Sequence, residues 1–372
     1  MNINPRLLVN KRGKLLHDVF VPRPLQEVEK KLVFDIDILE LLMNANEAIS
    51  RFHNTLQETD FYQHSYFFDY CLKKETVSSL EINGHPAALE NLMITALGRA
   101  DDDIVYRFYS LTKTATSNPA KLSSAYLKKL HSQMITEEAR HPGQYRTGYN
   151  MLYSYYRHNR FNPPLDEEIE SSMNSLEEYI NQTNNTNYLI KAALIHYQFT
   201  TIHPFVDGNS RLARLLNMLY LKQSNPFGPY CFYLSYYILA HLNEYYQALT
   251  EVRTHGNYQG WVEYYLRAVN DVSNHMRNIL EYSAELLTDN RIKIMESSFS
   301  NTIKNTLFSL VEYMVFNPLA PIKQLSSAVN RSFPAVSNSV KTLVRMQILE
   351  PSGHYERSRL YIYRQQLDIL KK

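Results

Sequence analysis

The sequence has few of the residues that build disulfide-linked or metal-stapled proteins. Its 372 residues include only two cysteines, Cys71 and Cys231. Two cysteines cannot form a disulfide framework, a four-cysteine zinc site or an iron–sulfur cluster. Glycine and proline are also scarce, at 10 and 15 residues, which excludes collagen-like and low-complexity chains. We therefore expect an ordered protein from a reducing compartment.

Long apolar runs are missing as well. No stretch reaches about 18 uncharged apolar residues, the length that spans a bilayer as a helix. The first residues, MNINPRLLVNKRGK, do not place an apolar segment after a cationic one, as a signal peptide does. We therefore expect a cytoplasmic protein that has no membrane partner.

Positive and negative charges nearly balance over the whole chain, but they are distributed unevenly along the sequence. The formal net charge is +2, from 39 Lys and Arg against 37 Asp and Glu. Residues 301–372 contain ten Lys or Arg and four Asp or Glu, so this segment carries +6 and the rest of the chain −4. The basic charge is therefore concentrated in the last 72 residues.

Apolar residues recur at intervals of three and four over long spans, which predicts a mainly α-helical fold. Two such stripes lie in residues 187–202 and 211–223. Residues 142–165 differ, because they are rich in tyrosine and carry prolines near both ends. This composition predicts a hairpin or an extended surface flap.

The segment HPFVDGNSRLAR, residues 203–214, joins the two apolar helices. Pro204 and Gly208 interrupt helical continuity, so the residues between His203 and Asn209 are predicted to form a loop. The second helix then opens at about Gly208, with unpaired N–H groups and the positive end of its dipole. Such a helix start favours an anion.

The side chains around this helix start suit a phosphate with a magnesium ion. Asp207 offers oxygen ligands to the cation, and Asn209 offers hydrogen bonds to phosphate oxygens. Arg211 and Arg214 lie three residues apart on one helical face and can bind outer phosphates. His203, whose ordinary pKa is about 6.5, is a candidate base for an attacking hydroxyl.

Each of these residues also has an ordinary structural explanation. A histidine before proline is commonly a loop residue, Asn–Ser is a common helix cap, and exposed arginines commonly meet solvent. Their joint occurrence within twelve residues favours chemistry. The motif GxxxxGK[ST], a kinase catalytic loop and HExxH are absent from the sequence, so phosphate-loop NTPase, protein kinase and zinc protease functions have no support.

HPFVDGNSR resembles the signature loop of the Fic family, HPFx[D/E]GN[G/K]R, at eight of nine positions. The resemblance runs from about residue 75 to the end, through PGQYR at 142–146, the helix before the loop, and FYLSYY and EYYQAL after it. It implies a mainly α fold, namely a Fic-type helical domain with a small β-hairpin flap and a C-terminal winged helix-turn-helix domain. The implied domains are residues 1–90 (an N-terminal arm and helices), 91–285 (the Fic catalytic domain) and 286–372 (a linker helix and the winged helix).

Members of the Fic family mostly transfer AMP from ATP to a Ser, Thr or Tyr hydroxyl of a protein and release pyrophosphate. The resemblance implies a protein adenylyltransferase with ATP and Mg²⁺ as cofactors and a protein, including the enzyme itself, as substrate. The roles it implies are a base (His203), a core anchor (Phe205), a magnesium ligand (Asp207), an α-phosphate contact (Asn209), an anion hole (Gly208 and the backbone of Ser210) and β- and γ-phosphate contacts (Arg211 and Arg214).

Ser210 occupies a position that is Gly or Lys in the family pattern, and its effect on activity is left open. Two other functions also stay open. One is a DNA-binding regulator whose Fic-like domain senses a nucleotide or is weakly active. The other is removal of AMP, or transfer of a different phosphate-containing group.

Many Fic proteins carry an inhibitory helix with the pattern [S/T]xxxE[G/N], whose glutamate pairs with the second arginine of the loop. ETVSSLEINGH, residues 75–85, places Ser79 at the first position and Asn83, a neutral amide, where the glutamate is expected. Glu81 lies about 200° away around a helix and cannot replace it without a register shift. We expect Asn83 to hold Arg214 weakly and built-in inhibition to be weak or absent. An ordinary helix end, with Gly84 at its terminus, is the structural alternative.

The flap, residues 145–164, is expected to pair with an extended segment of the protein substrate by strand addition. In the C-terminal segment, residues 305–316 read as an apolar helix, and residues 320–330 and 332–350 as a helix-turn-helix followed by a strand. The resemblance adds a wing near Gly353. The candidate DNA contacts are Ser337, Asn338 and Lys341 on the second helix and Arg357 and Arg359 on the wing. Winged helices also serve as dimerisation and protein-docking modules, so DNA binding and a homodimer both stay open.

Overall fold

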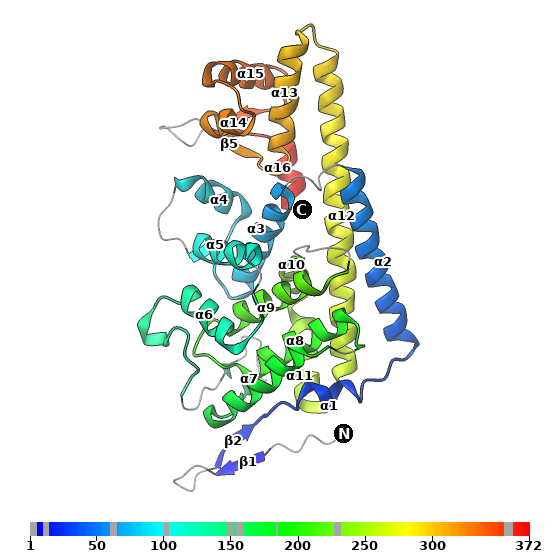
Figure 1. Ribbon diagram of the computed structural model, residues 1–372, viewed down its shortest axis with the longest axis vertical. Coiled ribbons are helices and arrows are strands. Elements are labelled where there is room, and N and C mark those ends of the chain that lie inside the picture. Colours follow the sequence, from blue (N-terminus) through cyan, green and yellow to red (C-terminus); the bar gives the residue numbers. More distant parts are fainter. Residues whose placement is uncertain are drawn as a thin grey trace. The chain divides into compact units, whose positions relative to one another are not determined.

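The computed structural model describes residues 6–9, 15–59, 65–99, 104–118, 120–147, 152–153, 160–183, 185–226, 232–352 and 360–372. These residues are mainly helical (Figure 1), which confirms the predicted fold class. Two two-stranded hairpins and a three-stranded antiparallel sheet complete the described part of the chain. No helix within the described ranges is both long enough and apolar enough to cross a bilayer.

Packing divides the chain into two compact units, and each unit is discontinuous in sequence. The first consists of residues 1–50, 74–86 and 107–273, and the second of residues 51–73, 87–106 and 274–372. Helices α2, α3, α5 and α12 therefore have residues in both units. The domain boundaries given above, after residues 90 and 285, remain predictions.

The first unit contains most of the helices and both hairpins. Its elements, some of which continue into the second unit, are β1 (Arg6–Val9), β2 (Leu15–Val19), α1 (Leu25–Glu29), α2 (Ile36–Glu58), α3 (Ser65–Ile82), α5 (Ile104–Ser117), α6 (Ser124–Met134), the 3-10 turn η3 (Glu138–Arg140), β3 (Leu152–Tyr153), β4 (Arg160–Phe161), α7 (Asp166–Asn181), α8 (Tyr188–Ile202), α9 (Asn209–Ser224), α10 (Leu234–Ala240), α11 (Leu242–His255) and α12 (Tyr258–Met295).

Helix α8 forms the core of the first unit. All residues from Leu189 to Ile202 are buried, as expected of a helix that is apolar on every side. Its start is capped by Asn187, whose side-chain oxygen accepts a hydrogen bond from the backbone N–H of Leu189 at 2.8 Å. Helix α9 packs against α8 (Figure 1), and both helices match the two predicted apolar stripes.

A backbone hydrogen bond joins the N-terminal arm to the flap. The N–H of Phe20 donates to the carbonyl oxygen of Asn162 at 3.0 Å. In the flap, β3 pairs with β4 in an antiparallel register, with Leu152 opposite Phe161. The predicted hairpin is thus present in the residues that are described, whereas Tyr149, Tyr155 and Tyr156 lie outside them.

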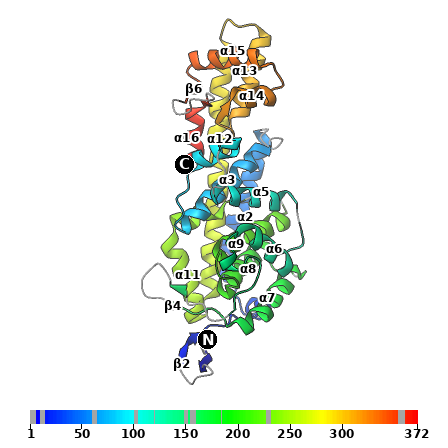
Figure 2. The same cartoon turned by 90° about the vertical axis from the view of Figure 1, so that its left-hand side faces the viewer.

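The second unit combines short helices with the three-stranded sheet, whose strand order is β5-β7-β6. Helices α13, α14 and α15 group together in both views (Figures 1 and 2). Helix α15 buries Val336, Val340 and Leu343, whereas Val344 is only half-buried. The predicted wing contacts at Arg357 and Arg359 lie outside the described residues. The remaining elements are α4 (Leu89–Ile94), the π-helical turn η2 (Thr95–Arg99), α13 (Asn301–Met314), β5 (Leu319–Pro321), α14 (Ile322–Ala328), α15 (Phe333–Arg345), β6 (Glu350–Pro351), β7 (Leu360–Ile362) and α16 (Arg364–Lys371).

Candidate active site

The loop between α8 and α9 is entered and left through left-handed backbone conformations. His203 ends α8 with φ 50°, and Gly208 caps α9 with φ 75°. A Cβ atom at Gly208 would lie 2.7 Å from the Cε atom of Met134 and 3.2 Å from Cδ1 of Ile135. The left-handed backbone angle therefore favours glycine at this position, and any larger residue would also have to displace the side chains of Met134 and Ile135.

Phe205 anchors the middle of the loop in the core. Its side chain is fully buried and stacks on the ring of His131, with ring centres 3.9 Å apart and planes 8° from parallel. The ring of Tyr145 lies 5.4 Å away on another side. The anchoring position predicted for Phe205 is thus observed.

Asn209 holds the loop through the backbone of Phe205. Its Oδ1 accepts a hydrogen bond from the N–H of Phe205 at 2.9 Å, and its Nδ2 donates to the carbonyl oxygen of Phe205 at 2.8 Å. The side chain is buried, so these bonds are shielded from water. The structure therefore gives Asn209 a bracing position, and its contact with the α-phosphate remains a prediction.

Replacing Asn209 by alanine is expected to destabilise the protein. The N–H and carbonyl oxygen of Phe205 would lose their partners inside the core, which costs about 1–3 kcal/mol for each buried group that stays unpaired. We expect the free energy of unfolding, measured by urea denaturation, to fall by about 2 kcal/mol or more. Asn44→Ala, at an exposed position of α2, is the matched control and should change it by less than about 0.5 kcal/mol. Equal losses in the two variants would contradict the bracing position.

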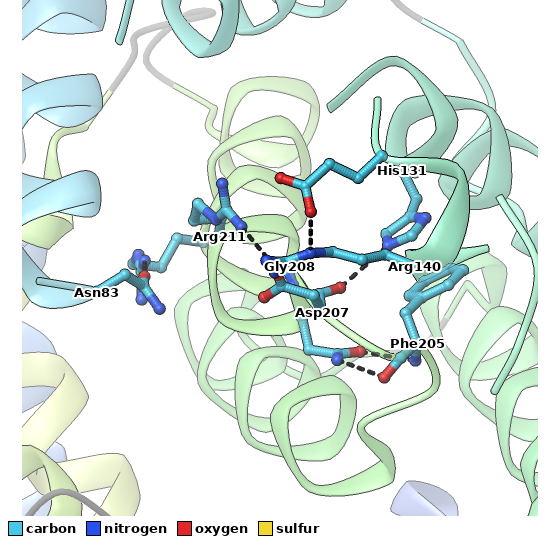
Figure 3. Close-up of polar contacts among 10 residues, drawn as sticks. Asn83, His131, Arg140, Phe205, Asp207, Gly208 and Arg211 are labelled. Atoms are coloured by element: carbon cyan, nitrogen blue, oxygen red, sulfur yellow. Dashed lines mark hydrogen bonds and ion pairs between the residues drawn. The ribbon is translucent and has the colours of Figure 1, made fainter. Parts of the chain in front are cut away.

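The carboxylate of Asp207 lies among cationic groups and N–H donors (Figure 3). Its Oδ1 accepts a hydrogen bond from the N–H of Gly208 at 2.6 Å, and its Oδ2 forms an ion pair with Arg140. The Nη2 atom of Arg211 lies 3.6 Å from the same Oδ2 atom. Burial alone would raise the pKa of Asp207, but the Gly208 hydrogen bond and the two guanidinium groups lower it. Asp207 is therefore ionised at neutral pH.

His131 fixes the backbone of Asp207 from the end of α6. Its Nδ1 accepts a hydrogen bond from the N–H of Gly143 at 2.8 Å. Its Nε2 must then carry the proton of the neutral ring, and it donates to the carbonyl oxygen of Asp207 at 3.0 Å. Burial lowers the pKa of His131, which favours this neutral form. The ring thus ties the PGQYR segment to the loop.

Arg146 holds the backbone at His203. Its Nε donates to the carbonyl oxygen of His203 at 2.8 Å, and its Nη2 donates to that of Pro164 at 2.5 Å. Its own N–H donates to the carbonyl oxygen of Pro204 at 2.9 Å. The bonds to His203 and Pro204 stabilise a left-handed conformation that costs an ordinary residue about 1–3 kcal/mol, and the bond to Pro164 ties Arg146 to the flap.

The imidazole of His203 is neutral at neutral pH. Its pKa is lowered well below its usual range, first by burial and then by the nearby guanidinium groups of Arg146 and Arg253. A neutral imidazole has a free nitrogen lone pair that can accept a proton. His203 is therefore unprotonated and can accept a proton at neutral pH, but its lowered pKa makes it a weaker base than an ordinary histidine.

The second arginine of the loop motif is bound by α3. Arg214 donates from Nε to the hydroxyl of Ser79 at 2.8 Å and from Nη2 to the carbonyl oxygen of Ser79 at 2.7 Å. Nη2 also donates to Oδ1 of Asn83 at 2.5 Å, as the sequence suggested. Glu81 is exposed and interacts electrostatically with Lys74 instead. The neutral Asn83 amide thus occupies the expected inhibitory position.

A small cavity of about 20 Å³ lies behind Arg214. Its lining is mostly apolar and aromatic but also includes Glu75, His196 and Ser235. The carboxylate of Glu75 accepts hydrogen bonds from the N–H of Ser235 at 3.0 Å and from its hydroxyl at 2.5 Å. Burial raises the pKa of Glu75 to about 7, although Ser235 and the charge of Arg214 oppose this shift. Glu75, Ser79 and Asn83 are spaced four residues apart, so the face of α3 that binds Arg214 also carries a buried acid.

His196 makes the stability of the first unit depend on pH. Its ring is buried, its Nε2 lies 3.0 Å from the hydroxyl of Tyr245, and burial together with the charge of Arg214 lowers its pKa to about 3. Because the unfolded chain binds a proton at His196 below about pH 6.5 and the folded chain does not, acidification favours unfolding. Between pH 7 and pH 5 we expect the wild type to lose about 2 kcal/mol more unfolding free energy than His196→Gln. The unfolding free energy of both proteins is measured by urea denaturation at each pH. If it fell equally in the two proteins between pH 7 and pH 5, His196 would not be the cause of the pH dependence.

The structure brings the sequence-predicted residues together on one helix-loop-helix of the first unit. His203, Asp207, Asn209, Arg211 and Arg214 all lie on the loop or in the first turns of α9. Ser210 is half-buried in the first turn of α9, and Arg211 is buried. All the residues that the sequence proposes for the site lie within the described part of the chain. Their chemical roles are predictions.

Sequence reasoning assigned no role to Arg140, Arg146, His131 or Glu75. Arg146 is the last residue of PGQYR, a segment that takes part in the resemblance to the Fic family. That segment is the sequence signal for a role of Arg146. Arg140 and His131 lie more than sixty residues before Asp207, and nothing in their local sequence marks them as its neighbours. Glu75 begins the segment ETVSSLEINGH but lies four residues before Ser79, the first position of the inhibitory pattern.

Residues 121–221 match the Fic/DOC family. The chain is 25% identical over 156 residues to a probable protein adenylyltransferase of Aquifex aeolicus, an alignment that covers 40% of this chain and 48% of the relative. It is 40% identical over 67 residues to the protein adenylyltransferase Fic of Drosophila mojavensis, covering 17% of this chain and 13% of that protein. The alignments thus span about half or less of these curated relatives.

Solved structures show the same fold over more of the chain. A Fic family protein from Desulfovibrio desulfuricans aligns with a TM-score of 0.59 at 19% identity, covering 89% of this chain and 97% of that one. A Fic domain containing signaling protein from Bacteroides thetaiotaomicron aligns with a TM-score of 0.52 at 17% identity, covering 65% of this chain and 97% of that one. Residues 121–221 therefore match a Fic/DOC domain, and the solved structures of Fic proteins show the same fold.

Proposed function

We propose that this protein is a protein adenylyltransferase, which transfers AMP from ATP to a Ser, Thr or Tyr hydroxyl of a protein and releases pyrophosphate. The observation that carries the proposal is the loop between α8 and α9, which combines a neutral histidine, an ionised aspartate and two buried arginines around one helix start. The relatives named as protein adenylyltransferases support the same chemistry.

In this proposal His203 takes the proton of the target hydroxyl. The hydroxyl oxygen attacks the α-phosphorus of ATP, a new phosphorus–oxygen bond forms, and the bond to the β-phosphate oxygen breaks. The proton moves from the hydroxyl to the imidazole, and pyrophosphate leaves. Arg146 contributes by fixing the backbone that carries the imidazole, because a base must lie within hydrogen-bond reach of its proton.

The groups around α9 suit the triphosphate. The backbone N–H groups at the start of α9 lie at the positive end of its dipole and can donate to phosphate oxygens. Arg211 and Arg214 supply positive charge in a largely water-excluded position, where an electrostatic contact is stronger than in solvent. This arrangement stabilises the negative charge that accumulates on the leaving pyrophosphate.

Asp207 is the residue that would hold Mg²⁺. Within the described ranges no group of three or more His, Cys, Asp or Glu side chains is arranged to bind a metal, so phosphate and water oxygens would complete the coordination. One carboxylate with substrate phosphates is the usual protein contribution to a Mg²⁺–nucleotide site, and the ionised Asp207 fits it. When bound, the ion would neutralise charge on the phosphates.

The flap is the proposed docking edge for the protein substrate. Strands β3 and β4 form a two-stranded hairpin, and Asn162 and Pro164 after it contact Phe20 and Arg146. An extended target segment that pairs with this hairpin would be recognised mainly through its backbone. Such pairing would bring its hydroxyl toward the loop that Arg146 holds.

The proposal is tested by following the position of a label in ATP. The full chain is incubated with Mg²⁺, a protein extract and ATP labelled at either the α- or the γ-phosphate. We expect label from the α-position to become covalently attached to protein and label from the γ-position to appear in pyrophosphate. Attachment of the γ-label alone, or of neither label, would reject AMP transfer.

A second candidate activity, DNA binding, concerns the C-terminal segment. Helices α14 and α15 are joined by a short turn, and α15 exposes Asn338 and Lys341 on the side opposite its buried residues. With the sheet order β5-β7-β6, this arrangement supports a winged helix that contacts a DNA groove through α15. Affinity for duplex DNA should then fall steeply as salt is raised, and affinity that does not change with salt would exclude phosphate contacts.

A further inference from the structure

Arg140 is a cation of the site that the signature motif does not contain. It ends the 3-10 turn η3, and its guanidinium pairs with Oδ2 of Asp207. Its Nε donates to Oε2 of Glu137 at 2.6 Å, so one arginine bridges two carboxylates. The inference below rests on the proposed function, because it concerns the metal that Asp207 would hold.

The end of α6, which precedes the turn that carries Arg140, packs on the loop. His131 donates to the backbone of Asp207, and Met134 and Ile135 fill the space that a Cβ atom at Gly208 would need. Residues 137–140 are exposed or half-buried, so Arg140 reaches Asp207 through its long side chain.

The two arginines that face Asp207 differ in their freedom to move. The side chain of Arg211 is 5% exposed, whereas that of Arg140 is 43% exposed. A buried guanidinium cannot leave its position without unpacking the core, but an exposed one can rotate into solvent or toward a new partner at little cost. Arg140 is therefore the partner of Asp207 that can exchange.

A guanidinium paired with a carboxylate weakens the affinity of that carboxylate for Mg²⁺. The two positive charges of the ion repel a third, so the ion binds less tightly while the arginine stays in place. Oδ1 of Asp207 accepts a hydrogen bond from the N–H of Gly208, whereas Oδ2 forms the ion pair with Arg140 and lies 3.6 Å from Nη2 of Arg211.

We propose that Arg140 competes with Mg²⁺ for the carboxylate of Asp207, which would hold the metal more tightly once Arg140 has left it. Arg140 is thus a positioning residue that holds the carboxylate until a nucleotide arrives. The negative charge of the triphosphate shifts the competition toward the metal, because phosphates attract both Mg²⁺ and the displaced guanidinium. Metal binding then depends on the nucleotide.

The test measures binding of Mn²⁺, used in place of Mg²⁺, by electron paramagnetic resonance of the free ion. The full chain is titrated without nucleotide, the state in which Arg140 pairs with Asp207, because a free triphosphate would itself bind Mn²⁺. Arg140→Gln removes the competing charge, and we expect it to bind Mn²⁺ about three- to tenfold more tightly than the wild type, the effect of losing an exposed ion pair and one like charge.

Two further variants control for general effects of charge and packing. Arg140→Lys keeps the charge and should stay within about twofold of the wild type. Lys129→Gln removes one positive charge from an exposed position of α6 and should leave Mn²⁺ affinity unchanged. Equal or weaker Mn²⁺ binding by Arg140→Gln would overturn the competition while leaving the proposed function intact. Failure of the wild type to bind nucleotide and metal together would overturn both proposals.

Discussion

Replacing His203 by alanine is expected to lower the rate of AMP transfer by about 10²- to 10⁴-fold, the usual contribution of a general base. The imidazole is neutral because burial and the guanidinium groups of Arg146 and Arg253 lower its pKa. Alanine offers no atom that accepts a proton. The measurement is the initial rate at which label from the α-phosphate of ATP is attached to protein.

The control for this substitution is His203→Asn. Asparagine tolerates a left-handed backbone better than alanine does, so the loop is retained while the base is lost. The two variants should therefore show similar losses of activity, with His203→Asn the closer to the wild type in thermal unfolding. Transfer by either variant at more than a tenth of the wild-type rate would refute the role of His203 as the base.

Replacing Asn83 by glutamate is expected to suppress AMP transfer about 10- to 100-fold. In the wild type Arg214 donates to the neutral amide oxygen of Asn83 at 2.5 Å. A carboxylate at the same position would form a charge-assisted hydrogen bond, which is worth about 1.5–3 kcal/mol, and would compete with the phosphate for the guanidinium. The measurement is the transfer rate at an ATP concentration below KM.

Asn83→Gln separates the effect of charge from that of length, since glutamine has the size of glutamate and no charge. It should transfer AMP at a rate within about threefold of the wild type. Because Asn83 is exposed at the end of α3, both substitutions should leave the thermal stability nearly unchanged. Equal activity of Asn83→Glu and Asn83→Gln would show that the charge at this position does not control Arg214.

Much of the fold near the site follows from local sequence. The apolar stripes predict α8 and α9, and Pro204 and Gly208 predict the loop between them. These predictions hold because helix periodicity and helix interruption act over a few residues. The predicted flap is visible where its residues are described, at β3 and β4.

The surroundings of the loop could not be predicted in the same way. Asn209 reads as a phosphate ligand in the motif, yet its amide braces Phe205, since a buried backbone turn needs partners for its polar groups. The contact of Arg214 with α3 spans 135 residues to Ser79 and was suggested only by the resemblance. The pairing of Arg140 with Asp207 had no signal in the sequence at all.

The sequence by itself determined the two helices, the loop between them and the chemical groups that the loop carries. Only the tertiary structure decided which distant groups surround them: His131 and Arg146 on the backbone, Arg140 on the carboxylate, and the α3 face behind Arg214. The physical reason is that the two kinds of feature depend on interactions over different distances along the chain. Backbone periodicity and turn formation are set by neighbours in the chain, whereas burial, and the pKa and hydrogen-bond partners that depend on it, are set by segments that packing brings together.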